Sequence, residues 1–153
     1  MPSLALKIPP PVVAVCVAVA MWLLSHVAPV FTVPDAARIG MAVAIVLLGG
    51  AISLAGVLEF RRARTTVNPM KPQRASSLVV SGIYKLTRNP MYVGLLLVLV
   101  AWAAFLSAAW SLVGPVAFFA YIGRFQIAPE EKVMAEKFGA EFAAYQSRVR
   151  RWL

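Results

Sequence analysis

The chain has 153 residues, of which 61% are hydrophobic and 14% are charged, and its formal net charge is +9. Soluble domains carry roughly 45–50% apolar residues, so the composition excludes an ordinary soluble domain and favours one integral membrane domain covering residues 1–153. The Lys and Arg residues lie between apolar segments instead of forming a stripe on a polar surface. We therefore expect them to contact anionic lipid head groups, and we expect no nucleic-acid partner.

Four apolar segments predict about four transmembrane helices. The first covers residues 12–31 and is longer than the apolar core of a secretory signal, and the second covers 38–60. The third and fourth, 91–106 and 110–124, divide an apolar run that is too long for one span. The sequence thus predicts an all-α, polytopic membrane protein.

The second span carries two informative features. Gly49, Ser53 and Gly56 recur on one face, which lets a neighbouring helix approach closely. Glu59 ends the span beside two arginines, so we expect it at the membrane interface in an ion pair with Arg61 or Arg62.

The residues that most often bind metals are scarce. Cys16 is the only cysteine and His26 is the only histidine. A single cysteine excludes a disulfide framework and a cysteine metal cluster within one chain. A lone imidazole without acidic or cysteine neighbours is typical of a hydrogen-bonded helix residue. The sequence therefore predicts no metal site.

The segment between the second and third spans, residues 61–89, is polar and basic. Positive residues mark cytoplasmic loops, and with an even number of spans both termini are then predicted to lie in the cytoplasm. We expect a multi-pass protein of the bacterial inner membrane. The positive residues of this loop are Arg61, Arg62, Arg64, Lys71, Arg74, Lys85 and Arg88.

The C-terminal segment, residues 129–150, is predicted to form an amphipathic helix outside the membrane. Pro129 fits the first helical position, and Glu130 and Glu131 complement the positive end of the helix dipole. Apolar residues recur at helical spacing, so this helix is expected to lie against the membrane surface or against the basic loop. Gly139 is expected to break or kink it.

The stretch 82–94 joins the basic loop to the third span. Pro90 suits the first turn of a helix, and Asn89 before it can cap the first free N–H groups. The positive end of the helix dipole then faces Arg88 and Tyr84, an arrangement suited to a carboxylate or a phosphate. A basic turn at the membrane surface, without a ligand, is the alternative interpretation.

A second polar cluster follows the fourth span and contains Arg124, Gln126, Glu130 and Glu131. The third and fourth spans are predicted to form a hairpin, so their cytoplasmic ends are neighbours and the two clusters can form one pocket. A ligand that carries both a carboxylate and an ammonium would match this pocket, with a glutamate as the partner of the amine. In the alternative interpretation both glutamates only cap a helix.

The order and spacing of these motifs resemble the isoprenylcysteine carboxyl methyltransferase and phospholipid N-methyltransferase superfamily. The similarity extends over residues 62–153. It rests on a glycine-tyrosine turn, an arginine-led segment at the start of a span, a pair of glutamates and a phenylalanine-glycine segment. In this chain these motifs are Gly82-Ile83-Tyr84, Arg88-Asn89-Pro90-Met91-Tyr92-Val93-Gly94, Glu130-Glu131 and Phe138-Gly139-Ala140-Glu141-Phe142-Ala143-Ala144-Tyr145.

The resemblance implies an enzyme that uses S-adenosylmethionine to methylate a lipophilic acceptor at the membrane surface. An isoprenylcysteine carboxylate, a phospholipid amine and a small hydrophobic molecule all remain open as acceptors. Arg124 and Glu131 are the implied catalytic residues, and Arg124 and Gln126 would bind the substrate. The implied cofactor-binding residues are Gly82, Tyr84, Arg88, Asn89, Pro90, Tyr92, Gly94, Glu130 and Glu131.

The chain departs from the pattern of the superfamily at three positions. Ile83 replaces a proline, and Asn89 replaces a histidine, so this position cannot titrate near neutral pH. Gln126 stands where carboxyl methyltransferases often have an arginine, and the nearest arginine is Arg124. The last difference argues against a prenylcysteine carboxylate as acceptor more than it argues against the cofactor.

Two other classes of protein fit a chain of this kind. A small four-helix transporter would need an acid deep in an early span, whereas Glu59 lies at the end of one. A membrane reductase with a nicotinamide cofactor has a related C-terminal architecture. Binding of S-adenosylmethionine would distinguish a methyltransferase from both.

Overall fold

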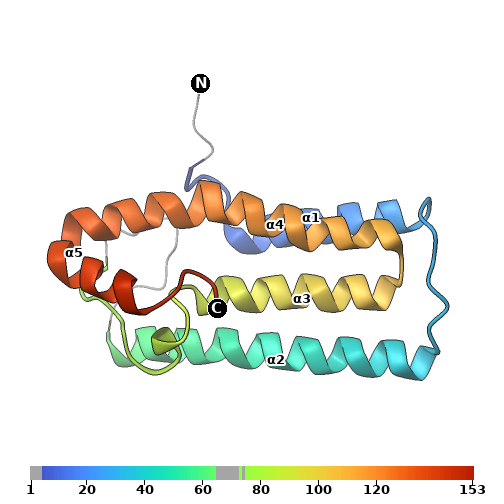
Figure 1. The fold of residues 1–153 in the computed structure, drawn as a ribbon, viewed down its shortest axis with the longest axis horizontal. Coiled ribbons are helices and arrows are strands. Elements are labelled where there is room, and N and C mark those ends of the chain that lie inside the picture. The colour runs from blue at the N-terminus through green and yellow to red at the C-terminus, as the bar shows by residue number, and fades with distance from the viewer. Residues whose placement is uncertain (1–4, 65–72, 74) are drawn as a thin grey trace.

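In the computed structural model, which describes residues 5–64, 73 and 75–153, the helices lie roughly along one long axis (Figure 1). Two 3-10 turns, η2 (Gly82–Lys85) and η3 (Ala109–Leu112), and the π-helical segment η4 (Gly123–Ile127) complete the described secondary structure. No β-strand occurs in these residues, so the all-α prediction is confirmed. The α-helices are α1 (Pro10–Ser25), α2 (Asp35–Arg62), α3 (Pro90–Leu106), α4 (Val113–Ile122) and α5 (Ala128–Arg148).

Among the described residues, two helices are long and apolar enough to cross a membrane: α2, and the continuous 40-residue helix Ala109–Arg148. Helices α1 and α3 are apolar but shorter. Because a bilayer core of about 30 Å takes roughly 20 helical residues, the 40-residue helix extends well beyond such a core. Most of its charged residues follow Pro129, so the part after Pro129 is the part that extends beyond the core.

The predicted first span, 12–31, is wrong at its C-terminal end, since α1 ends at Ser25. Residues that precede a proline disfavour helical geometry, and Pro29 lies just beyond the helix. The chain then pairs with the turn between α3 and η3: Phe31 donates its N–H to the carbonyl of Ser107 (2.7 Å), and Ala109 donates to the carbonyl of Pro29 (3.0 Å).

Helices α2 and α3 lie side by side, and small residues let their backbones approach closely (Figure 1). A Cβ built on Gly49 would lie 2.8 Å from the carbonyl oxygen of Gly94, and one on Gly94 would lie 2.5 Å from that of Gly49. A Cβ on Gly56 would meet the ring of Pro90 at 3.0 Å. The predicted packing role of Gly49, Ser53 and Gly56 is thus confirmed.

We expect the substitution Gly94→Ala to destabilise the protein, because the new methyl group would press on the backbone of Gly49. Overpacking of this kind costs about 1–3 kcal/mol in free energy of unfolding. Gly50→Ala is the matched control, since a Cβ there has nothing within 4 Å. Thermal unfolding in detergent would measure both variants, and equal midpoints for the two would contradict the prediction.

Helix α5 does not begin from a loop, as the sequence suggested; it continues α4 through the π-helical segment Gly123–Ile127. Pro129 lies in the first turn of α5, as predicted, but inside this continuous helix. A proline there lacks an N–H and crowds the carbonyl four residues earlier, that of Phe125, and a π-turn relieves such crowding. The carbonyl of Phe125 accepts an N–H from Leu6 instead (3.1 Å).

The far part of α5 folds back against the loop before α3 (Figure 1). Gly139 adopts φ +48° inside the helix, so the predicted kink is confirmed. Phe142 and Tyr145 pack with Tyr84 in a small apolar core, and the hydroxyl of Tyr145 donates to the carbonyl of Tyr84 (2.7 Å). The amphipathic segment was predicted to lie against the membrane or against the basic loop, and the structure shows it against the basic loop. Two positive residues of that loop, Lys71 and Arg74, lie outside the described residues.

Candidate functional site

The start of α3, the turn η2, the first turns of α5 and the C-terminus meet at one end of the bundle (Figure 1). Glu59 closes this end of α2: its carboxylate pairs with Arg62 (2.6 Å) and accepts a short hydrogen bond from Ser81. The predicted ion pair of Glu59 is therefore confirmed. Gly82 packs directly on this carboxylate with φ +55°, a close contact that only glycine allows.

Helix α3 begins at Pro90, as predicted, but the side chain of Asn89 does not cap it. The backbone carbonyl of Asn89 already accepts the N–H groups of Tyr92 and Val93, each at 3.0 Å. The side-chain amide of Asn89 instead donates to the carbonyl of Arg151 (2.8 Å). The cap prediction is wrong because the C-terminal residues lie against this loop and offer a carbonyl.

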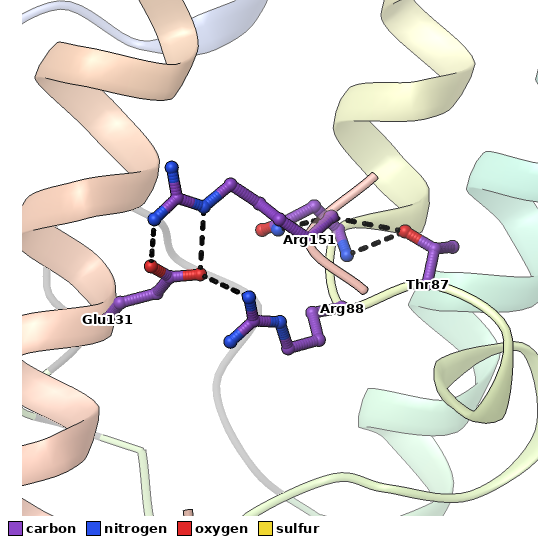
Figure 2. Close-up of polar contacts among 5 residues, drawn as sticks. Thr87, Arg88, Glu131 and Arg151 are labelled. Atoms are coloured by element: carbon purple, nitrogen blue, oxygen red, sulfur yellow. Dashed lines mark hydrogen bonds and ion pairs between the residues drawn. The ribbon is translucent and has the colours of Figure 1, made fainter. Parts of the chain in front are cut away.

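Glu131 lies in a group of two arginines and one carboxylate, called here the anion cluster: Arg88, Glu131 and Arg151 (Figure 2). Arg151 donates through Nε to Oε1 of Glu131 (3.1 Å) and through Nη2 to Oε2 (2.5 Å). Arg88 makes one contact, from Nη2 to Oε1 (3.2 Å). Two guanidinium groups around one carboxylate leave the cluster with a net positive charge.

The guanidinium of Arg88 keeps donors that no described residue uses. Its side chain is only 13% exposed, and its Nε and Nη1 are buried without a hydrogen-bond partner. Buried donors are nearly always paired in folded proteins, because an unpaired one costs about 1–3 kcal/mol. Unpaired donors in a positive cluster are suited to an anionic ligand such as a carboxylate.

Glu130, the next residue along the helix, has quite different surroundings, called here the acid cluster: Tyr92, Gln126 and Glu130. The Tyr92 hydroxyl (2.6 Å) and the Gln126 amide (2.5 Å) both donate to Oε1 of Glu130. These partners are neutral. Burial raises the pKa of the Glu130 carboxyl from 4.5 to about 7, although the two hydrogen bonds lower it. A partly buried carboxyl whose described partners are neutral is suited to an ammonium group.

Tyr84 adds a second residue with an unpaired buried polar group at this end of the bundle, as far as the described residues show. Its ring is buried against Phe60, and its hydroxyl has no partner in the described part of the chain. Burial first, and then the charges of Tyr145, Glu130 and Glu59, raise the pKa of this hydroxyl. The phenol therefore stays protonated near neutral pH and can donate a hydrogen bond.

The other sequence-predicted site residues lie outside the two clusters. Gly94 packs against α2, and Pro90 is buried against Gly56. Arg124 is exposed in the π-helical segment, and its guanidinium lies over the ring of Phe125 (5.8 Å). No group of three or more His, Cys, Asp or Glu that could hold a metal ion occurs among the described residues.

Sequence reasoning missed Thr87 and Arg151. Thr87 is fully buried; its hydroxyl accepts the N–H of Asn89 (3.1 Å) and donates to the carbonyl of Arg151 (3.4 Å). Arg151 stands in a run of C-terminal arginines, and nothing in that run distinguishes the one that reaches Glu131. The sequence indicated only that basic residues outnumber acidic ones, so that each glutamate has several possible arginine partners.

The sequence model of a protein family described as "Phospholipid methyltransferase" matches residues 37–141. The chain belongs to the phospholipid methyltransferase family. The match contains both clusters except for Arg151, and it confirms the superfamily that the motifs indicated. Membership indicates a methyltransferase associated with membranes, and it lends no support to a transporter or a nicotinamide-dependent reductase.

One relative of this phospholipid methyltransferase family member is an uncharacterized protein of Haemophilus influenzae. The two are 44% identical over 63 residues, which cover 41% of this chain and all of the relative. No solved structure matches the chain. The function of the family member must therefore be argued from its own site.

Proposed function

We propose that the protein is a multi-pass membrane enzyme that transfers a methyl group from S-adenosylmethionine to a lipophilic acceptor. The observation that carries the proposal is the opposite character of two adjacent glutamates. Glu131 belongs to a net positive cluster with unpaired Arg88 donors, and Glu130 is a partly buried carboxyl with neutral partners. A ligand with both charges, bound between the clusters, meets a partner for each of them.

The residues present fit S-adenosylmethionine, whose methionyl part carries a carboxylate and an ammonium on one carbon. Nε and Nη1 of Arg88 would hold the carboxylate, and Glu130 would accept from the ammonium. The competing interpretation, in which both glutamates cap a helix, loses support, because α5 continues α4 and shows no side-chain cap. The Tyr92 N–H is already bonded to Asn89, so the Arg88 side chain is the better anion site.

When bound, the cofactor supplies a methyl group activated by a positively charged sulfur. Such a transfer is an in-line displacement, so the chain contributes mainly by orienting the reactants and excluding water, worth up to roughly 7–11 kcal/mol. Arg88 would hold the carboxylate of the cofactor, and Glu130 would hold its ammonium. Tyr92 and Gln126 fix Glu130, and they keep one of its oxygens occupied.

An apolar groove between α1, α2 and α3 favours a lipophilic acceptor. The groove has a volume of about 560 Å³ and is lined by aliphatic and aromatic side chains, among them Ala14, Val46 and Leu95. Of the lining residues on α3, Leu95 is the nearest to the site, about one helical turn from Tyr92 of the acid cluster. Arg124, exposed near the end of the apolar helix, is proposed to bind the acceptor head group.

Transfer of radiolabel from S-adenosylmethionine tests the proposal. Membranes that contain the protein are incubated with the labelled cofactor, and lipids, small organic molecules and protein are then separated. We expect label in one of these fractions, and none above background for the double variant Arg88→Met, Glu130→Gln. If the wild-type protein binds the cofactor but labels no fraction above that control, the methyltransferase proposal is refuted.

The proposed membrane topology has four spans, with the candidate site and both termini in the cytoplasm. In a Cys16→Ser background, a cysteine at Gln73 should react with an impermeant thiol reagent only from the cytoplasmic side. The exposed Val27, in the connection between α1 and α2, is the reciprocal position and should react from the periplasmic side. Labelling of position 73 from the periplasmic side would contradict the proposed topology.

A further inference from the structure

The last five residues, 149–153, called here the C-terminal strap, lie across the loop that precedes α3. The carbonyl of Arg150 accepts the backbone N–H of Arg88 (3.0 Å), and the carbonyl of Arg151 accepts from Asn89 (2.8 Å). The indole of Trp152 stacks on Phe119 of α4, with 4.6 Å between ring centroids. The strap is therefore attached through its backbone and through Trp152.

The side chain of Arg151, unlike its backbone, contacts Glu131 (Figure 2). It engages both oxygens of Glu131, whereas Arg88 reaches only Oε1. A carboxylate can accept a bidentate arginine, so without Arg151 both oxygens of Glu131 would be open to Arg88. Arg88 would then turn its free donors toward Glu131 and form a neutral pair with it.

We infer that Arg151 is a positioning residue for the carboxylate of the cofactor. By occupying Glu131, it keeps Nε and Nη1 of Arg88 available for an anion, and it supplies the second positive charge that makes the cluster net positive. The inference rests on the proposed function, and it assigns a role in cofactor binding to a residue outside the matched family region.

The backbone attachment of the strap makes this role separable from folding. A substitution at Arg151 removes the guanidinium but keeps the carbonyl that Asn89 and Thr87 contact. The Arg151 side chain is 41% exposed, whereas that of Glu131 is 15% exposed. Loss of the guanidinium therefore opens no large cavity, and Glu131 retains Arg88 as a partner.

The test compares S-adenosylmethionine with its decarboxylated form, which keeps the sulfonium and the amine. Calorimetry on the full chain in detergent should show that Arg151→Ala weakens binding of S-adenosylmethionine by about tenfold. Its affinity for the decarboxylated ligand should stay within twofold of wild type. Arg151→Lys keeps the positive charge but lacks the two-pronged guanidinium. Its affinity for S-adenosylmethionine should lie between those of wild type and Arg151→Ala.

Arg150→Ala is the matched control, because the contact of Arg150 with Arg88 is made by its backbone carbonyl. In turnover experiments, Arg151→Ala should raise KM for the cofactor and leave kcat at saturation nearly unchanged. If Arg151→Ala does not fold, Arg151→Lys provides the same comparison.

Three results would overturn the inference while the proposed function stands: unchanged S-adenosylmethionine affinity, equal losses for both ligands, or a loss in Arg150→Ala as large as in Arg151→Ala. A wild-type protein that binds neither ligand would instead refute the proposed function, and the inference with it.

Discussion

Replacement of Arg88 by methionine is expected to raise the dissociation constant for S-adenosylmethionine by roughly thirtyfold or more. Removal of one partner from a buried, hydrogen-bonded charge pair costs about 2–5 kcal/mol in binding free energy, which sets this range. The fold should survive, because Arg151 still pairs with Glu131 and the backbone N–H of Arg88 still donates to Arg150. Calorimetry with the purified protein measures the change.

Arg148→Met is a suitable control for this variant, because it removes an equal charge from an exposed position on α5. A long-range electrostatic effect would appear in both variants, and it would weaken at higher salt. Unchanged affinity in Arg88→Met would mean that the unpaired donors of Arg88 do not face the ligand.

Replacement of Glu130 by glutamine should weaken cofactor binding by a similar amount and should also remove a pH dependence. Burial raises the pKa of Glu130 to about 7, and only the ionised carboxyl attracts an ammonium. Wild-type affinity is therefore present above pH 7 and is lost as the pH falls through that value. Between pH 7.5 and pH 5.5 the ionised fraction decreases roughly twenty-five-fold, and the affinity should follow.

Glu130→Gln keeps the acceptor oxygen for Tyr92 and Gln126 but cannot ionise, so its weaker binding should not vary over this pH range. Glu136→Gln, on the outer part of α5, is a matched control and should keep the wild-type profile. A pH profile that persists in Glu130→Gln would assign the titration to another group, such as the cofactor amine.

Much of the site location could be predicted from the sequence, because it depends on short-range rules. Pro90 starts α3 since a proline needs no N–H partner there, and Gly139 kinks α5 since it alone in that helix adopts a positive φ. The pairing of Glu59 with an arginine followed from their spacing on one helix.

The separate roles of Glu130 and Glu131 could not be predicted, because they depend on partners distant in sequence. Arg151 reaches Glu131 only after Gly139 turns the chain back, and Tyr92 reaches Glu130 only after α3 and the long helix have packed. Likewise, the local preference of Pro129 for a helix start gave no sign that the preceding residues would also be helical. The π-turn makes room for the proline ring, and the N–H of Leu6 pairs with the Phe125 carbonyl that the proline cannot reach with a hydrogen bond.

During synthesis at the ribosome, Leu6 leaves the exit tunnel long before Phe125 is made. The N–H of Leu6 therefore lacks its carbonyl partner until most of the chain has been translated. Glu130, whose carboxylate accepts from Tyr92, is translated shortly after Phe125 and is therefore also a late partner. Neither the contact between Leu6 and Phe125 nor the acid cluster can therefore form before most of the chain has been translated, and a chain released before Phe125 would have neither.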